Sequence, residues 1–146
     1  MKNSLTLFAQ IIISTFTILL MSCNSDENND ILNSDCSNET CTELFLTIII
    51  SIEDQNQNPV ALDSFEVLNL DNGSEITIPL SPSGLVLAQE LGKYPLVADG
   101  GIKINQEVQL QFKGFINNQE VINGNYTASA DCCHVILISG ELQLIL

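Results

Sequence analysis

The chain of 146 residues contains no arginine and no tryptophan, and its four lysines face 18 acidic residues, which gives a formal net charge of −14. A protein so short of positive charge repels nucleic-acid phosphates and anionic lipid headgroups. The composition therefore excludes nucleic acid as a partner. The lack of tryptophan, with only Tyr94 and Tyr126 as tyrosines, also argues against the aromatic platforms of sugar-binding proteins, and both tyrosines are expected in the core or at a sheet edge.

Catalytic motifs are equally scarce. His134 is the single histidine, and no G-x-S-x-G, phosphate-binding-loop or H-E-x-x-H pattern occurs. The acidic stretches "DQNQNP" at 54–59 and "DNGSE" at 71–75 superficially resemble calcium loops. The first lacks the glycine that such a loop needs at its sixth position and the second is too short, so both are interpreted as turns. The sequence predicts no enzyme and no cofactor.

The N-terminus carries a long apolar run, which begins at Leu5 behind Lys2 and ends at Met21. This run is typical of a signal peptide and is short for a membrane span. The stretch "LLMSC" at 19–23 resembles the lipobox of bacterial lipoproteins, in which the cysteine sulfur forms a thioether with diacylglycerol. The resemblance implies a cleaved signal peptide at 1–22 and a lipid anchor on Cys23, which would tether the protein to a membrane without crossing it.

Residues 23–43 are polar and acidic, beginning with "NSDENND" after Cys23. Such composition leaves nothing to bury, so this segment is predicted to be a disordered tether. The acidic run beside the cysteine resembles the export signal of Bacteroidota surface lipoproteins. That resemblance implies an outer-membrane location with display on the cell surface.

From residue 44 the pattern changes to alternating apolar and polar residues. "LFLTIIISIE" at 44–53 and "EVQLQFKGFI" at 107–116 are the clearest strands, and "NNQ" at 117–119 is typical of a hairpin turn. About nine short strands are expected in all, an arrangement typical of an all-β sandwich. The further expected strands lie at 65–70, 75–79, 84–91, 94–98, 120–127, 133–139 and 141–146. Residues 44–146 are therefore predicted to form a single antiparallel sandwich.

Two phrases carry a family resemblance. "ISIEDQNQNPVAL" is similar to the opening of transthyretin-like and carboxypeptidase-regulatory-like sandwich domains, and "YTASADCCHVILISGELQLIL" resembles the C-terminus of small Bacteroidota lipoproteins. The resemblance implies a transthyretin-like or immunoglobulin-like sandwich with an accessory role. The histidines and the C-terminal tetrapeptide of the transthyretin-like hydrolases are missing, which weakens an enzymatic interpretation.

Four cysteines remain once Cys23 is assigned to lipid: Cys36, Cys41, Cys132 and Cys133. An even number in an exported chain indicates disulfides, and four cysteines allow three pairings. Bonding the adjacent Cys132 and Cys133 to each other would strain the ring. In a transthyretin-like sandwich the first and penultimate strands run parallel side by side, so the resemblance favours Cys41 with one of the adjacent pair and Cys36 with the other.

A metal site is the alternative for the same residues. Cys132, Cys133 and His134, with the two earlier cysteines, include enough soft ligands for a tetrahedral site, although C-x4-C is not the usual zinc spacing and an oxidising compartment favours disulfides. His134 alone is interpreted as a structural residue. Two functions stay open: a surface lipoprotein that binds a protein partner or serves as a structural module, and a small-ligand or metal-binding module that uses the Cys/His cluster or the acidic loops.

Overall fold

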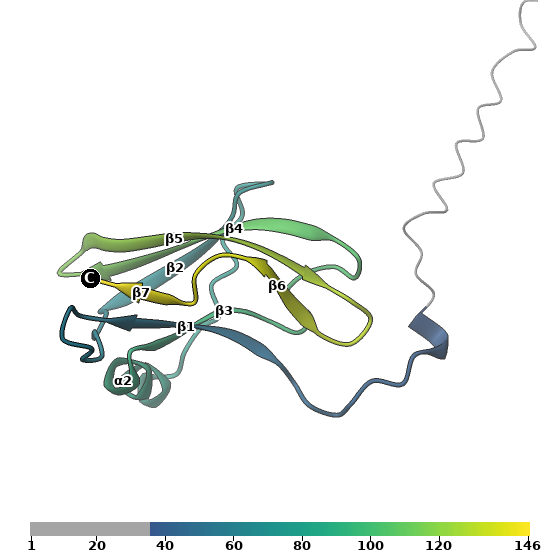
Figure 1. Cartoon of the computed structure of the whole chain (residues 1–146), viewed down its shortest axis with the longest axis horizontal. Helices are drawn as coiled ribbons and strands as arrows, with labels where there is room; N and C mark the ends of the chain where they lie inside the picture. The colour runs from purple at the N-terminus through teal and green to yellow at the C-terminus, as the bar shows by residue number, and fades with distance from the viewer. Residues whose placement is uncertain (1–35) are drawn as a thin grey trace, which may run out of the picture. The chain divides into compact units, whose positions relative to one another are not determined.

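The computed structural model describes residues 36–146 and shows a sandwich of two β-sheets (Figure 1). Its elements are η1 (Cys36–Asn38), β1 (Thr47–Glu53), β2 (Ser64–Asn69), α2 (Pro82–Leu91), β3 (Lys93–Ala98), β4 (Glu107–Ile116), β5 (Gln119–Ala130), β6 (Val135–Ser139) and β7 (Gln143–Ile145). One sheet has the order β3-β1-β7 and the other β2-β4-β5-β6. The all-β sandwich expected from the sequence is confirmed. The predicted signal peptide, the predicted lipid-bearing Cys23 and most of the predicted tether lie outside the described residues.

The two sheets pack their apolar faces together. In β1 and β4 the alternation expected from the sequence is confirmed at Ile50, Ile52, Leu110 and Phe112, which are all fully buried. The first strand is shorter than expected, because it begins at Thr47 and not at residue 44. The centre of the core is a cluster of three rings, in which the Phe65 ring lies 5.6 Å from that of Tyr94 and 5.8 Å from that of Phe112, centroid to centroid. Such tilted and offset aromatic contacts hold the two layers in one relative position.

Both tyrosines belong to this core, as the sequence indicates. The Tyr94 hydroxyl accepts a hydrogen bond from Leu62 N at 2.7 Å and donates to Val60 O at 2.9 Å. The Tyr126 hydroxyl donates to Glu141 O at 2.9 Å. Burial raises the pKa of Tyr94, and burial with the nearby Glu141 charge raises the pKa of Tyr126 to about 12. Each buried hydroxyl therefore remains neutral and fixes a loop to the core.

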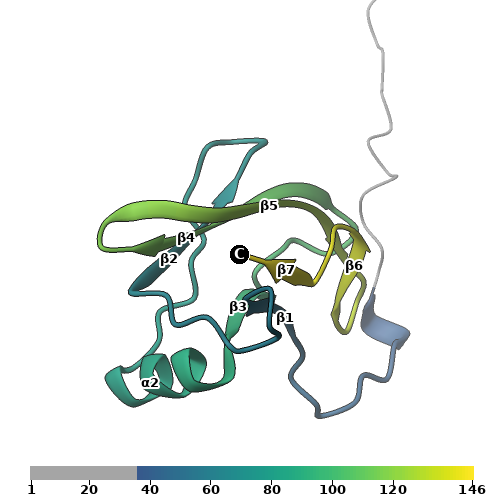
Figure 2. The ribbon, with the colours of Figure 1, turned by 60° about the vertical axis from the view of Figure 1, so that its left-hand side comes forward.

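The predicted strand at 84–91 is wrong, because these residues belong to helix α2. Ser81 caps the helix by accepting a hydrogen bond from Gly84 N at 3.1 Å, Pro82 occupies the first turn, and Gly92 ends the helix in a left-handed conformation. These are strong helix-boundary signals. Figures 1 and 2 place α2 on the side of the β3-β1-β7 sheet that faces away from β4 and β5.

Two further expectations are corrected. Residues 75–79 form no strand, since only Glu75 pairs, through an isolated bridge with Leu68. The parallel neighbour of β1 is the last strand β7, paired Ser51 to Gln143 through Glu53 to Ile145, and β6 pairs with β5 in the other sheet. The expected parallel pair of first and penultimate strands is therefore wrong. The hairpin turn after β4 is confirmed by the positive φ angles of Asn117 and Asn118, as a type I′ turn requires.

Candidate functional site

Two disulfides join the N-terminal segment to the loop between β5 and β6. Cys36 is bonded to Cys132 and Cys41 to Cys133, over sequence separations of 96 and 92 residues. The cross-pairing agrees with the expectation from the sequence. The disulfides thereby hold residues 36–41 against the loop between β5 and β6. We refer to the two disulfides and residues 36–46 as the clamp.

Asp99, directly after β3, is the polar centre of the clamp. Its Oδ2 accepts a hydrogen bond from Leu46 N at 2.7 Å, its Oδ1 accepts one from Val135 N at 2.8 Å, and its side chain is only 12% exposed. Asp99 N in turn donates to Leu46 O at 3.0 Å. The Leu46 N–H is the main cause that lowers the pKa of Asp99, and His134 and Val135 add to it. An ionised Asp99 therefore connects three segments.

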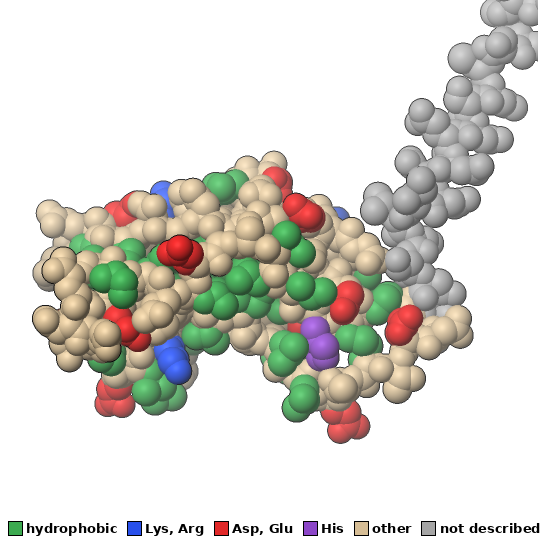
Figure 3. Space-filling view, in the orientation of Figure 1, with side chains coloured by type: hydrophobic (Ala, Val, Ile, Leu, Met, Phe, Trp, Pro, Cys, Tyr) green, Lys and Arg blue, Asp and Glu red, His purple; other side chains and the backbone are tan. Residues whose placement is uncertain are grey.

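His134 completes this connection. Its Nδ1 lies 2.9 Å from Asp99 Oδ2 and its Nε2 lies 3.0 Å from Thr42 Oγ1. Because an ionised carboxylate only accepts, Nδ1 carries a proton and donates it to Asp99, while Nε2 and the Thr42 hydroxyl form a second hydrogen bond. In Figure 3 the purple side chain of this single histidine lies at the surface of the domain, at the end that carries the clamp. The structural role expected for His134 is therefore to join Thr42 to Asp99.

The loop that carries His134 is itself ordered by an acidic residue. Asp131 Oδ1 accepts hydrogen bonds from Cys133 N at 2.7 Å and from His134 N at 2.8 Å. These N–H groups lower the pKa of Asp131, with the one from His134 the larger cause. The turn thus presents the adjacent cysteines to two different partners and points the imidazole at Asp99.

Residues 36–146 contain no arrangement of side chains that supports the alternative of a metal site. Both Cys132 and Cys133 are consumed by disulfides, and no group of three His, Cys, Asp or Glu side chains in this part of the chain is placed to hold a metal ion. The acidic loops are also occupied internally. Asp54 Oδ1 accepts from Asn56 N at 2.8 Å and Asn58 N at 2.9 Å, and the Asn58 side chain is the main cause that lowers the pKa of Asp54. This arrangement is turn chemistry.

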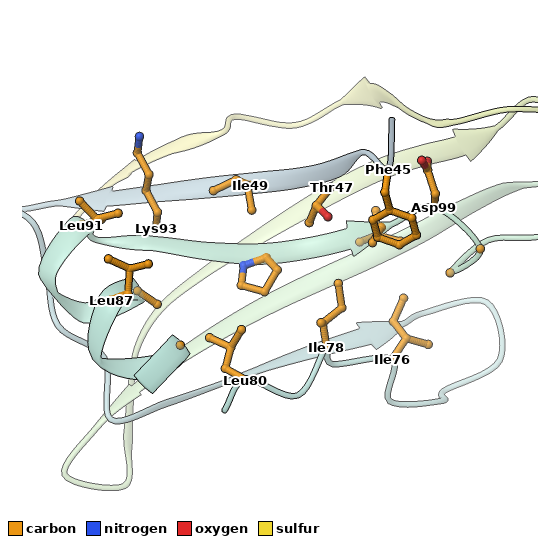
Figure 4. Close-up of a pocket in the computed structure, with 17 residues that line it drawn as sticks. Phe45, Thr47, Ile49, Ile76, Ile78, Leu80, Leu87, Leu91, Lys93 and Asp99 are labelled. Atoms are coloured by element: carbon orange, nitrogen blue, oxygen red, sulfur yellow. The ribbon is translucent and has the colours of Figure 1, made fainter. Parts of the chain in front are cut away.

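The clamp positions one wall of an apolar groove. Leu46 is fixed to Asp99 by the two backbone contacts described above, and this places the neighbouring Phe45 beside Asp99 at one end of the groove (Figure 4). The groove has a volume of about 680 Å³ and extends along the outer face of β1 and β3. Its position follows from strand alternation, because residues between the core positions point to the opposite side of the sheet.

The groove is lined almost entirely by hydrocarbon. Strands β1 and β3 contribute Thr47, Ile49, Lys93, Pro95 and Val97, helix α2 contributes Leu87, Ala88 and Leu91, and the irregular segment after β2 contributes Ile76, Ile78 and Leu80. Figure 4 shows Ile76, Ile78 and Leu80 opposite the strands, with Leu87 and Leu91 at the other end from Phe45. Several of these apolar side chains are open to solvent, among them Phe45 at 71% exposed and Leu87 at 55%. An apolar hollow of this kind is the usual form of a ligand site.

Charged groups occur only at the ends of the groove. Asp99 lies at the Phe45 end, and its oxygens already accept the hydrogen bonds described above. Lys93 lies at the opposite end, where Figure 4 shows its stem beside Leu91 and its ammonium pointing out of the groove. Among residues 36–146 the ion pairs are Lys113 with Glu120 and His134 with Asp99, so within that range the Lys93 ammonium has no carboxylate partner.

Sequence reasoning located the disulfides but missed the groove. The signal for it was the cap pattern around α2, with Ser81 and Pro82 at the start and Gly92 at the end. Comparisons with protein-family models, with curated proteins and with solved structures give no match for this chain. No helix among residues 36–146 is long and apolar enough to cross a membrane.

Proposed function

We propose that the protein is an exported bacterial lipoprotein, anchored in the outer membrane through Cys23 and displayed at the cell surface, whose sandwich is a non-enzymatic module that binds an apolar ligand. The lipobox-like "LLMSC" at 19–23 and the acidic stretch after it support the anchor and the location. The two disulfides support export, because such bonds persist in oxidising compartments.

The apolar groove is the single observation that carries the binding role. Monomeric proteins seldom leave a contiguous hydrophobic surface uncovered, and where they do it usually serves recognition. Here Phe45, Leu87 and Leu91 are 71%, 55% and 49% exposed around a hollow of about 680 Å³. The Cys41–Cys133 disulfide and the contacts of Leu46 with Asp99 flank Phe45 in the sequence and restrict its backbone, which reduces the entropy lost when a ligand binds.

The anchor is tested by mass spectrometry of the protein produced in a bacterium that processes lipoproteins. The expected mature N-terminus is Cys23 carrying a diacylglycerol thioether, and Cys23→Ser should remove the lipid mass and release the protein from the membrane fraction. Protease treatment of intact cells tests display, since a surface-exposed protein is digested without lysis. An unmodified Cys23 in the membrane-bound chain contradicts the anchor.

The groove is tested with the Cys23→Ser chain, which needs no detergent once the lipid is absent. A neutral apolar dye such as Nile red should bind with enhanced fluorescence. Leu87→Asp should weaken dye binding at least about tenfold, because it places a charge in an apolar site. Val86→Asp is the matched control, since Val86 is 53% exposed on the same helix and does not line the groove. Equal effects of both variants exclude the groove as the binding site.

A further inference from the structure

We propose that the ligand of the groove is a single-chain amphiphile with an anionic headgroup, such as a fatty-acid carboxylate, whose alkyl tail lies along β1 and β3 toward Phe45 and whose head lies beside Lys93. This inference rests on the proposed function of the groove and specifies its ligand. It is carried by the chemistry of the lining, by the charge at each end, and by the strand that forms the wall.

The lining suits an alkyl chain and not a peptide. A peptide backbone brings an N–H and a C=O for every residue, and leaving these groups unpaired in an apolar site is costly. The groove offers few polar side chains to satisfy them, and the edge strand β3 has Pro95 at its centre, which removes one backbone donor from the row that a peptide would pair with. An alkyl chain brings no such requirement and gains about 0.8 kcal/mol for each buried methylene group.

The length of the groove fits one extended chain. Of its charged ends, Lys93 is the first of the six residues of β3 and Asp99 directly follows the last. A strand of that length spans about 20 Å. A tail that begins beside Lys93 therefore passes Leu87 and Ile49 and reaches Phe45 within the length of a common long-chain acid.

The charges at the two ends of the groove determine the orientation of the ligand and the sign of the charge on its headgroup. Asp99, at the Phe45 end, already accepts hydrogen bonds from Leu46, Val135 and His134 and offers no strong site to a cationic head. Lys93 is the one cation in the lining, and its ammonium lies at the rim, outside the hydrocarbon walls (Figure 4). The nearby Glu53 carboxylate accepts a hydrogen bond from Gln143 Nε2 at 2.9 Å. An anionic head can pair with Lys93 while it remains hydrated, provided that this local contact outweighs the repulsion from Glu53 and from the net charge of −14.

The test compares three ligands of equal chain length, dodecanoate, dodecanol and dodecylammonium, by displacement of Nile red from the Cys23→Ser chain. The expected order of affinity is dodecanoate above dodecanol above dodecylammonium. Lys93→Ala should weaken dodecanoate binding about three- to fivefold, the range of an exposed ion pair, and should weaken dodecanol binding less, because dodecanol loses only contacts with the Lys93 stem. Lys113→Ala is the control, because Lys113 lies on β4 in the other sheet and does not line the groove. The preference for dodecanoate should also fall with added salt.

The other outcomes separate this inference from the proposed function. Equal binding of all three ligands, or no effect of Lys93→Ala, overturns the headgroup assignment while the groove remains a binding site. Dye binding that no alkyl ligand displaces overturns the amphiphile altogether. A dimer that dissociates in the Leu87→Asp variant assigns the groove to a second copy of the chain. Absence of dye binding overturns the proposed function itself.

Discussion

His134 Nδ1 lies 2.9 Å from Asp99 Oδ2, across 35 residues of sequence, and this contact joins the loop before β6 to the end of β3. Around it, Asp99 also accepts the backbone N–H groups of Leu46 and Val135. Asp99 therefore both lines the apolar groove and binds Leu46 of the clamp, so the stability of the clamp depends on the charge of Asp99.

That charge makes the stability of the clamp depend on pH. The pKa values of Asp99 and Asp131 are lowered in the folded state, so each carboxylate stabilises the fold above its unfolded pKa of about 3.9. The contribution is lost as pH falls from that value through the lower, folded pKa. We expect the free energy of unfolding, measured by urea titration, to decrease from about pH 5 to about pH 2. Asp99→Asn should show a smaller decrease, and an identical pH dependence contradicts the assignment.

The order of hydroxyl, imidazole and carboxylate in Thr42, His134 and Asp99 is that of hydrolase triads. We expect it to fasten the clamp and not to catalyse. Thr42→Val should lower stability by about 1 kcal/mol, through loss of the hydrogen bond to His134. It should leave the hydrolysis of p-nitrophenyl esters at the rate of buffer alone, as the unmodified protein does. An esterase activity that Thr42→Val abolishes shows instead that the triad is catalytic.

Removing the first of the two disulfides should lower the free energy of unfolding less than removing the second. With one bridge intact, the other closes only a ring of eight residues, 36–41 with 132 and 133. In the chain-entropy model a ring of that size is worth about 2 to 3 kcal/mol, whereas the long loop is worth about 4 to 5 kcal/mol. Replacing Cys36 and Cys132 by serine should therefore cost about 2 to 3 kcal/mol. Replacing all four cysteines should cost about 6 to 8 kcal/mol, the sum of both contributions, and equal losses from urea unfolding contradict this account.

Gly92 ends helix α2 at a position where no side chain fits. A Cβ there would lie 2.5 Å from Ile52 O and 3.0 Å from Pro59 Cα, both of them backbone atoms. Gly73 has a similar φ, +71° against +61°, but a Cβ added to it would meet no atom within 4 Å. Gly73→Ala should cost about 1 kcal/mol for its backbone conformation alone, and Gly92→Ala about 3 kcal/mol or more, together with weaker binding in the groove. Similar melting temperatures for both variants contradict the steric account.

Tyr94 offers a test of the core. Tyr94→Phe leaves the Leu62 N–H and the Val60 C=O without their buried partner, which should cost about 1 to 3 kcal/mol in the free energy of unfolding. Tyr126→Phe removes one hydrogen bond, to the carbonyl of the exposed Glu141, and should cost about 1 kcal/mol or less. A larger loss for Tyr126→Phe contradicts the burial argument.

The sequence predicts the sandwich because most of its strands alternate clearly. β4 and the hairpin turn at Asn117 and Asn118 occur where they are expected, and the cysteines pair across the chain as expected. The helix was missed because Leu85, Val86 and Leu87 form a short apolar run, which periodicity alone does not distinguish from a strand. The groove could not follow from a pattern that lacked its covering helix, and the role of His134 depends on Thr42 and Asp99, which lie far from it in sequence.

The position of the disulfides also determines how the domain bears mechanical load. Tension that reaches Cys36 along the chain passes through the bond to Cys132 into the loop at the end of β5, before it reaches β1. Strand β1 lies between β3 and β7, so peeling it away would open the sheet that carries the groove. Pulling on the N-terminal side of the domain should therefore load the two disulfides before it loads the hydrogen bonds of β1.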